Sequence, residues 1–351
     1  MKSRWFPRLT RRARLVAVLA LGLAALPVAG AVADPNESPW HAAGRGFRNL
    51  DNSYNYTMSG RALGLVRRAF TKEPPRGAPP RPLANDGAEL RANGQHPTVT
   101  WIGHATLLVQ LAGVNVLTDP IWADHVGPPI FGVKRLVPPG IRFEDLPRIH
   151  AVVISHDHYD HLDFATVQRL AREHQTTFFV PLGIGAWLAE RGIKNVVELD
   201  WWQSRTFRGL TFTATPAQHG SGRGLLDQNE RLWASWVIAG AGKKLFFGGD
   251  TGYTPALAEI GKRLGPFDVA ALPIGGYSAF TARHPNHVNP EEALQLFEDL
   301  RGRVLVPMHW GTFALNREPF REPPERLLAE ALKRGEEESI ALLSQGQSIG
   351  W

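Results

Sequence analysis

The sequence of 351 residues contains no cysteine. Disulfide bonds are therefore excluded, and so is a lipid anchor attached through a cysteine thiol. A chain without cysteine is compatible with an oxidising compartment but does not require one.

Acidic residues are also absent from the first 33 positions, which carry six basic residues: Lys2, Arg4, Arg8, Arg11, Arg12 and Arg14. Residues 15–33 are uncharged and largely apolar, and they end in Ala31-Val32-Ala33, a small-x-small pattern typical of signal-peptide cleavage. We predict a secretory signal over residues 1–33, cleavage before Asp34, and a periplasmic or extracellular location.

Two alternatives concern the export route. The pair Arg11-Arg12 leaves a twin-arginine signal open beside ordinary secretion. An uncleaved membrane anchor is the other alternative, because an apolar stretch of this length could just span a bilayer. Pro27 and the Ala-x-Ala ending favour cleavage.

Net charge is lacking as well once the signal is set aside. Six of the 39 basic residues lie in residues 1–33, so the rest of the chain carries 33 basic and 33 acidic residues. The charge gives no reason to predict a nucleic-acid partner. The length after residue 33 suits one large α/β domain or two half-domains.

Regular structure is predicted mainly after residue 96. The proline pairs at 74–75 and 79–80 exclude a continuous helix across the preceding region, so residues 34–96 are predicted to form an irregular N-terminal arm with one weak helical stretch at 58–70. Residues 97–351 alternate strand and helix patterns, which indicates one α/β domain. Strands are predicted at 98–102, 106–111, 114–118, 151–155, 177–180, 196–199, 211–215, 232–239, 244–248, 269–272 and 304–307. Helices are predicted at 163–174, 184–191, 255–263, 290–300 and 323–333.

The most informative segment follows the apolar run at 151–154. His156, His158, Asp160 and His161 fall within six residues of a loop. Imidazole and carboxylate ligands suit Zn²⁺ or a similar ion, and the first two could serve one ion while the last two serve a second. A polar active-site rim or a pH-sensing histidine cluster is the alternative, but burial rarely requires so many titratable groups together.

Three further residues occupy the ends of predicted strands: His219, Asp250 and His309. Each taken alone is better explained by a core or loop role. Together with the loop they complete two metal shells in the order HxHxDH, H, D, H.

This ordered set resembles the metallo-β-lactamase fold superfamily. Further stretches resemble one family within it, the N-acylphosphatidylethanolamine-hydrolysing phospholipases D: 101–106, 118–120, 179–183, 198–202, 215–219, 249–253, 265–268, 273–275, 287–293 and 309–315. The resemblance spans residues 97–351 and implies an αββα sandwich of two sheets flanked by helices.

The resemblance also implies a role for individual residues. A first zinc ion would be bound by His156, His158 and His219. A second would be bound by Asp160, His161 and His309, with Asp250 bridging the two. Tyr159 and His287 match positions that contact the phospholipid head group, although packing explains Tyr159 equally and a surface position explains His287 equally. Iron or manganese in place of zinc stays an alternative.

The implied reaction is hydrolysis of N-acylphosphatidylethanolamine-type phospholipids to phosphatidic acid and N-acylethanolamine. A metal-bridging hydroxide would attack phosphorus, with Asp160, Asp250 and His287 as the catalytic residues. The alternatives are another hydrolase of this fold (a lactonase, a β-lactamase or a sugar-phosphate lactonase) and a non-catalytic metal-binding protein.

The sequence departs from the family's mammalian members at two positions, since they have Asn at the position of Asp157 and Asp at that of Asn289. Outside the ligand set, Asp119 and His104 are predicted to orient ligand imidazoles. A plain turn role for residues 118–120 explains Asp119 as well.

Membrane contact is predicted from the apolar, proline-rich segment 121–133, which could reach a bilayer interface or pack on the core. Trp201 and Trp202 are predicted to be core residues. The phospholipid substrate makes peripheral membrane contact the expected partner interaction, and a homodimer stays open.

Overall fold

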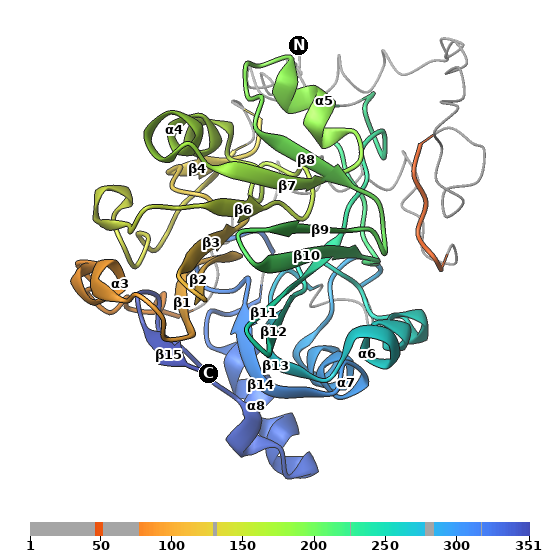
Figure 1. The fold of residues 1–351 in the computed structure, drawn as a ribbon. Helices are drawn as coiled ribbons and strands as arrows, with labels where there is room; N and C mark the ends of the chain where they lie inside the picture. Colours follow the sequence, from red (N-terminus) through yellow and green to blue (C-terminus); the bar gives the residue numbers. More distant parts are fainter. Residues whose placement is uncertain (1–45, 52–76, 129–131, 225, 278–283, 317) are drawn as a thin grey trace, which may run out of the picture. The chain divides into compact units, whose positions relative to one another are not determined.

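The computed structural model describes residues 46–51, 77–128, 132–224, 226–277, 284–316 and 318–351 (Figure 1). The predicted signal and the helix expected at 58–70 lie outside these residues. The N-terminal arm is described only at 46–51 and from residue 77 onward. All described residues belong to one compact unit of the chain.

Two large sheets form the centre of this unit (Figure 1). The first contains, in spatial order, β15 (Ser348–Gly350), β1 (Thr98–Gly103), β2 (Thr106–Leu111), β3 (Val114–Thr118), β6 (Ala151–Val153), β7 (Thr177–Pro181) and β8 (Val196–Leu199). The second contains β14 (Gly302–Met308), β13 (Phe267–Pro273), β12 (Lys243–Phe247), β11 (Ser235–Gly240), β10 (Leu210–Thr215) and β9 (Ser204–Phe207). A short pair, β4 (His125–Val126) and β5 (Val133–Lys134), lies apart from both.

Both sheets combine antiparallel and parallel pairing. In the first, β1, β2 and β3 pair antiparallel, and β3, β6, β7 and β8 pair parallel. In the second, β9 to β12 pair antiparallel, and β12, β13 and β14 pair parallel. Parallel strands place their carboxyl ends at the same edge of a sheet, so loops that follow them gather there.

Side chains from both sheets form a single hydrophobic core between them. Large fully buried members include Trp101 and Phe179 from the first sheet, and Phe212, Trp236 and Phe247 from the second. Phe179 and Phe212 stack across the interface with ring centroids 4.1 Å apart. Trp201 belongs to the same core, as predicted, and its indole donates to the carbonyl of Trp233.

Helices cover the outer faces of the two sheets (Figure 1). The first sheet carries α3 (Ala88–Ala92), α4 (Phe164–His174) and α5 (Ile184–Ala189). The second carries α6 (Ala258–Leu264), α7 (Pro290–Asp299) and α8 (Glu322–Arg334). Short 3₁₀ turns occur at η2 (Phe143–Asp145), η3 (Pro255–Leu257) and η4 (Glu337–Ser339). The αββα sandwich expected from the resemblance is confirmed.

The start of α7 illustrates how the sequence directs a boundary. The side chain of Asn289 accepts from the backbone N–H of Glu292, and the side chain of Glu292 accepts from that of Asn289, which completes a capping box. Pro290 occupies the first helical turn, as predicted. Asp, which the resemblance implies for mammalian members at this position, would serve equally well as an N-cap residue.

All predicted strands and helices after residue 96 are present, with boundaries shifted by a few residues. The pattern missed α3, β4, β5, β9 and β15, which are short. The strand predicted at 232–239 begins only at residue 235, and η3 opens the helix predicted at 255–263.

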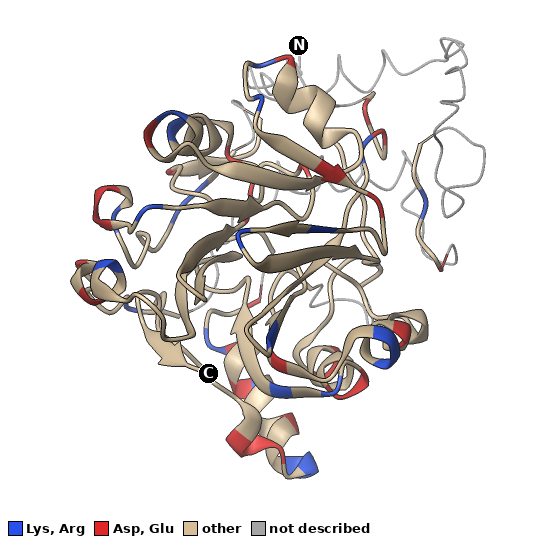
Figure 2. Cartoon of the chain, in the orientation of Figure 1, with Lys and Arg blue, Asp and Glu red and all other residues tan. Residues whose placement is uncertain are grey.

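Charged side chains of both signs are interspersed on the outer helices α4, α6 and α8 (Figure 2). Within the part of the chain that the structure describes, no helix combines the length and apolar character that crossing a membrane needs.

Candidate metal centre

Four loops bring the predicted ligands to one edge of the sandwich. The loop 154–162 follows β6 of the first sheet. His219 follows β10, Asp250 follows β12 and His309 follows β14, all in the second sheet. Both sheets therefore contribute to this edge. Each candidate ligand lies in a loop that follows a strand end, which fixes its position.

The first group consists of His156, His158 and His219. Nε2 of His156 lies 2.8 Å from Nδ1 of His158, and Nε2 of His219 lies 3.2 Å from the same atom. Three imidazole nitrogens thus converge on one point.

Outer partners determine which nitrogen of each ring faces this point. The hydroxyl of Ser155 donates to Asp119, so Nδ1 of His156 donates to Oγ of Ser155, 2.9 Å away. Nδ1 of His219 donates to the carbonyl of Asn286 at 2.9 Å. Nε2 of both histidines is therefore unprotonated, and its lone pair can bind a metal ion.

The second group consists of Asp160, His161 and His309, together with His104. Nε2 of His161 lies 3.5 Å from Oδ2 of Asp160, and Nε2 of His309 lies 3.7 Å from that same oxygen. Nδ1 of His161 makes a hydrogen bond with Oδ2 of Asp119 at 2.7 Å, so Nε2 of this ring also faces the centre.

Asp250 lies between the two groups. Its Oδ2 is 3.2 Å from Nε2 of His161 and 3.8 Å from Nε2 of His219, while its Oδ1 is 3.1 Å from Nε2 of His309. This carboxylate reaches ligands of both groups, which is the position that a bridging ligand requires.

Burial and neighbouring charges shift the pKa values of the site residues, downward for some residues and upward for others. Burial lowers the pKa of His219 to about 3, and burial together with neighbouring imidazoles lowers that of His156. Burial opposes ionisation of Asp250, but His161 and His309 outweigh it and hold the pKa of Asp250 well below its usual range. Burial likewise opposes protonation of His309, but Asp250 and Asp160 raise its pKa to about 9.

These groups fit a pair of cations. Nε2 of His161, Nε2 of His309 and Oδ1 of Asp250 are buried without a well-formed hydrogen bond, although His309 and Asp250 lie in ion-pair contact at 3.1 Å. Buried polar atoms normally make good hydrogen bonds, so three that do not, at one point, mark a place where a ligand belongs. Two ionised carboxylates among converging imidazole rings supply the nitrogen and oxygen donors that Zn²⁺ uses, once His309 has released its proton.

His104 and Asp119 contact ligand side chains. Nε2 of His104 lies 3.0 Å from Oδ2 of Asp160, and its ring is 4.0 Å from that of His309. Oδ2 of Asp119 accepts from His161 and from the hydroxyl of Ser155. His104, Asp119 and His309 all have positive φ, which residues other than glycine rarely adopt, so the backbone is strained at three positions of this centre.

Asp157, between two ligand histidines, points away from the centre. Its carboxylate is fully buried, accepts from the backbone N–H of Gly222 at 2.7 Å and pairs with Arg231. Arg231 also pairs with Asp227. This network joins the metal loop to residues 222–231.

Tyr159 packs against the same segment. Its hydroxyl donates to the carbonyl of Arg223 at 2.9 Å, and the guanidinium of Arg223 lies 4.0 Å from its ring centroid. Tyr159 also contacts a small apolar cluster of Ile121, Val126 and Phe313. Ile121 and Val126 of the segment 121–133 are thus buried, whereas Asp124, His125 and Pro128 are exposed, and residues 129–131 lie outside the described residues.

His287 faces the centre from outside the predicted ligand set. Its Nδ1 lies 3.7 Å from Oδ2 of Asp250 and has no hydrogen-bond partner, and its ring lies between those of His219 and His309. His287, Asp250 and His219 also form a group with metal-ligand geometry. His287 is therefore not the simple surface residue before α7 that the sequence left open as an alternative.

Three contributors escaped the sequence reasoning: Ser155, Asn286 and Asn49, whose side-chain amide makes hydrogen bonds with the backbone of His219. Ser155 had a signal, since it directly precedes His156. Asn286 acts through a backbone carbonyl and Asn49 lies far from the other residues in sequence, so neither left a pattern to find.

Comparison with known proteins places this geometry in a family. Residues 114–310 match the beta-lactamase superfamily domain. An N-acylphosphatidylethanolamine-hydrolysing phospholipase D of Caenorhabditis elegans is 40% identical over 263 residues, which cover 71% of this chain and 74% of that protein. The chain belongs to the metallo-β-lactamase fold superfamily, in the family of these phospholipases D.

Other relatives support the same placement. An uncharacterised protein of Mycobacterium tuberculosis is 43% identical over 86% of this chain and 82% of its own length. A protein of Methanopyrus kandleri, named a metal-dependent hydrolase, is 29% identical over 71% of this chain and 98% of its own. Among solved structures, a metallo hydrolase of Ignicoccus hospitalis is similar with a TM-score of 0.58, 25% identity and coverage of 73% of this chain and 99% of its own. The chain is therefore a metal-dependent hydrolase of this fold.

Proposed function

We propose that this hydrolase is a zinc-dependent phosphodiesterase that cleaves N-acylphosphatidylethanolamine-type phospholipids to phosphatidic acid and N-acylethanolamine. The observation that carries the proposal is the pairing of a complete two-group ligand cluster with 40% identity to a protein named for this reaction. Zinc is proposed because imidazole and carboxylate are donors that it uses, and metal analysis of the isolated protein distinguishes it from iron and manganese, which accept the same donors.

The residues of the chain supply the arrangement that the reaction needs. When bound, a pair of divalent cations lowers the pKa of water toward neutrality and offsets the negative charge of a phosphodiester. The two groups with Asp250 between them would hold such a pair. Asp119, Ser155 and Asn286 keep the ligand imidazoles oriented, so little rearrangement accompanies binding.

His287 is proposed to contact the substrate. Its Nδ1 is buried and faces Asp250, while the side chain as a whole is 17% exposed, so the ring extends from the two ligand groups to the surface, where a substrate phosphoryl oxygen would contact its exposed edge. Burial lowers the pKa of His287 well below its usual value, and a neutral imidazole can still donate one hydrogen bond to that oxygen.

The test is a product assay on the purified, zinc-loaded protein with N-acylphosphatidylethanolamine vesicles in ¹⁸O-water. Mass spectrometry should find phosphatidic acid that carries the label and N-acylethanolamine that does not. Label in a freed fatty acid would instead indicate an acyl hydrolase. Cleavage of a lactone or a β-lactam without cleavage of phospholipid would overturn the substrate proposal and leave the fold assignment intact.

The cellular setting is part of the proposal. Residues 1–33 have the composition of a secretory signal, which supports an exported enzyme that meets phospholipid at a membrane surface. A vesicle sedimentation assay with the mature chain tests the membrane contact, and the metal content of the isolated protein distinguishes zinc from iron and manganese.

A further inference from the structure

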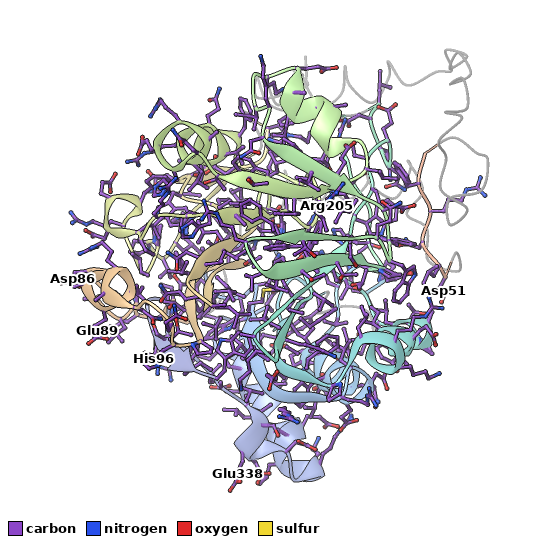
Figure 3. All side chains as sticks on the ribbon, in the orientation of Figure 1. Asp51, Asp86, Glu89, His96, Arg205 and Glu338 are labelled. Atoms are coloured by element: carbon purple, nitrogen blue, oxygen red, sulfur yellow. The ribbon has the colours of Figure 1, made fainter. Side chains whose placement is uncertain are left out.

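Residues 46–51, called here the N-terminal strap, lie against the loop that carries His219. The strap begins well before the matched domain, and 170 positions separate Asn49 from His219. Asn49 is buried, whereas its neighbours Arg48 and Leu50 are exposed. Asp51, at the end of the strap, is labelled in Figure 3.

The side-chain amide of Asn49 makes hydrogen bonds with both backbone groups of His219. Its Nδ2 donates to the carbonyl of His219 at 2.8 Å, and its Oδ1 accepts from the N–H of His219 at 2.9 Å. Oδ1 also accepts from the indole of Trp233 at 3.0 Å. His219 lies outside any strand, so its buried backbone groups have no ladder partners, and Asn49 supplies both.

Further bonds tie the strap down on either side of Asn49. The N–H of Phe47 donates to the carbonyl of Asn229 at 2.7 Å. The side chain of Gln218 donates to the carbonyl of Asp51 at 2.9 Å. The amide of Asn49 is thus presented to His219 by a segment that is itself held on both sides.

His219 is consequently held through both its backbone and its ring. Asn49 fixes its backbone, and the carbonyl of Asn286 fixes its ring through Nδ1. With both in place, Nε2 lies 3.2 Å from Nδ1 of His158. A shift of the His219 backbone would move this nitrogen, because the bond to Asn286 holds only the ring and leaves the buried backbone groups of His219 without the partners that Asn49 supplies.

We infer that Asn49 is a positioning residue for the ion held by His156, His158 and His219, and that the strap is a working part of the metal centre. The inference rests on the ligand assignment and not on the identity of the substrate. Asn49 acts on one group only, since its bonds reach His219 and Trp233 and none of the second group.

Two variants of Asn49 test this inference, and a third variant on the same strap serves as the control. Asn49→Ala removes all three hydrogen bonds. Asn49→Asp keeps the shape and the acceptor but places a carboxylate oxygen against the carbonyl of His219. Trp233 keeps its bond to the carbonyl of Ala217 at 2.9 Å in both variants. Leu50→Ala, at a side chain that is 40% exposed, is the matched control.

The measurements are Zn²⁺ affinity by chelator competition and the visible spectrum of the Co²⁺-loaded full chain. Each Asn49 variant should bind one of two ions roughly 10- to 100-fold more weakly than the wild type, the usual effect of losing an outer partner of a ligand. The other ion should be held as before. The Co²⁺ d–d bands should change only in the component that belongs to the weakened site.

Three results would overturn the inference. One is Zn²⁺ affinity in both variants equal to that of Leu50→Ala. Another is an equal loss of both ions from an Asn49→Asp protein whose circular dichroism shows it to be folded. A wild-type chain that binds no Zn²⁺ would remove the ligand assignment itself, whereas failure to cleave phospholipid would not affect the inference.

Discussion

Nε of Arg231 lies 2.5 Å from Oδ2 of Asp157, a carboxylate without exposed surface in the middle of the metal loop. The pair joins the loop that carries His156 and His158 to the segment around Gly222, whose N–H also binds Asp157. The departure of this chain from the mammalian members of its family at position 157 therefore has a structural counterpart, because the carboxylate has a cation to pair with.

Replacing Arg231 by Met should lower the free energy of unfolding by about 3–5 kcal/mol, because Asp157 would stay buried without its cation. Urea denaturation of the metal-free protein measures this. Adding Asp157→Asn should restore part of the loss, since the buried charge is then removed. Arg172→Met, at an exposed arginine, is the control. Equal stability of the Arg231 and Arg172 variants would refute the prediction.

Replacing Asp250 by Ala should remove at least one bound ion and reduce turnover by more than the roughly 10- to 100-fold typical of outer partners. The reason is that its two oxygens lie near ligands of both groups. Metal analysis and a turnover assay, with Asp86→Ala at an exposed carboxylate as control, measure the effect. Two retained ions with normal turnover would sink the bridging assignment.

Replacing His287 by Ala should lower turnover by roughly 10²- to 10⁴-fold while both ions stay bound, if the residue assists proton transfer or holds the phosphoryl group. His96→Ala, at the exposed histidine labelled in Figure 3, should change neither quantity. Loss of an ion from the His287 variant would instead show that His287 is itself a ligand, as its group with Asp250 and His219 permits.

Zinc affinity should rise with pH. Asp250 and Asp160 overcome the effect of burial and raise the pKa of His309 to about 9, so in the metal-free protein this ligand carries a proton below that pH. Zinc must displace the proton, and apparent affinity should therefore increase roughly tenfold per pH unit for each proton released, up to about pH 9. Calorimetry in buffers of different ionisation enthalpy counts the protons, and a count of zero at pH 7 would contradict the assignment.

The exported protein should begin at or near Asp34, because the apolar stretch ends in Ala31-Val32-Ala33. N-terminal sequencing of protein from a cell fraction outside the cytoplasm tests this. Substituting Lys for Arg11 and Arg12 would distinguish the routes, since only twin-arginine export requires that pair. An intact Met1 on membrane-embedded protein would favour an uncleaved anchor.

The sequence by itself determined the strands, the helices and the kinds of side chain at the site. Its strands are apolar, often β-branched runs with turn residues after them, and these signals lie within a few residues of one another. The HxHxDH loop is equally local, so His156, His158, Asp160 and His161 could be predicted together. The short strands β9 and β15 could not, because three or four residues carry too little pattern.

Only the tertiary structure decided how the ligands are held. Asn49 meets His219 across 170 positions, and Arg231 meets Asp157 across 74, through segments without regular periodicity. Such contacts depend on which buried backbone groups and charges the packed sheets leave without partners. That outcome belongs to the assembled fold and leaves no trace in local sequence, because a single buried amide or carboxylate looks the same along the chain whatever it contacts.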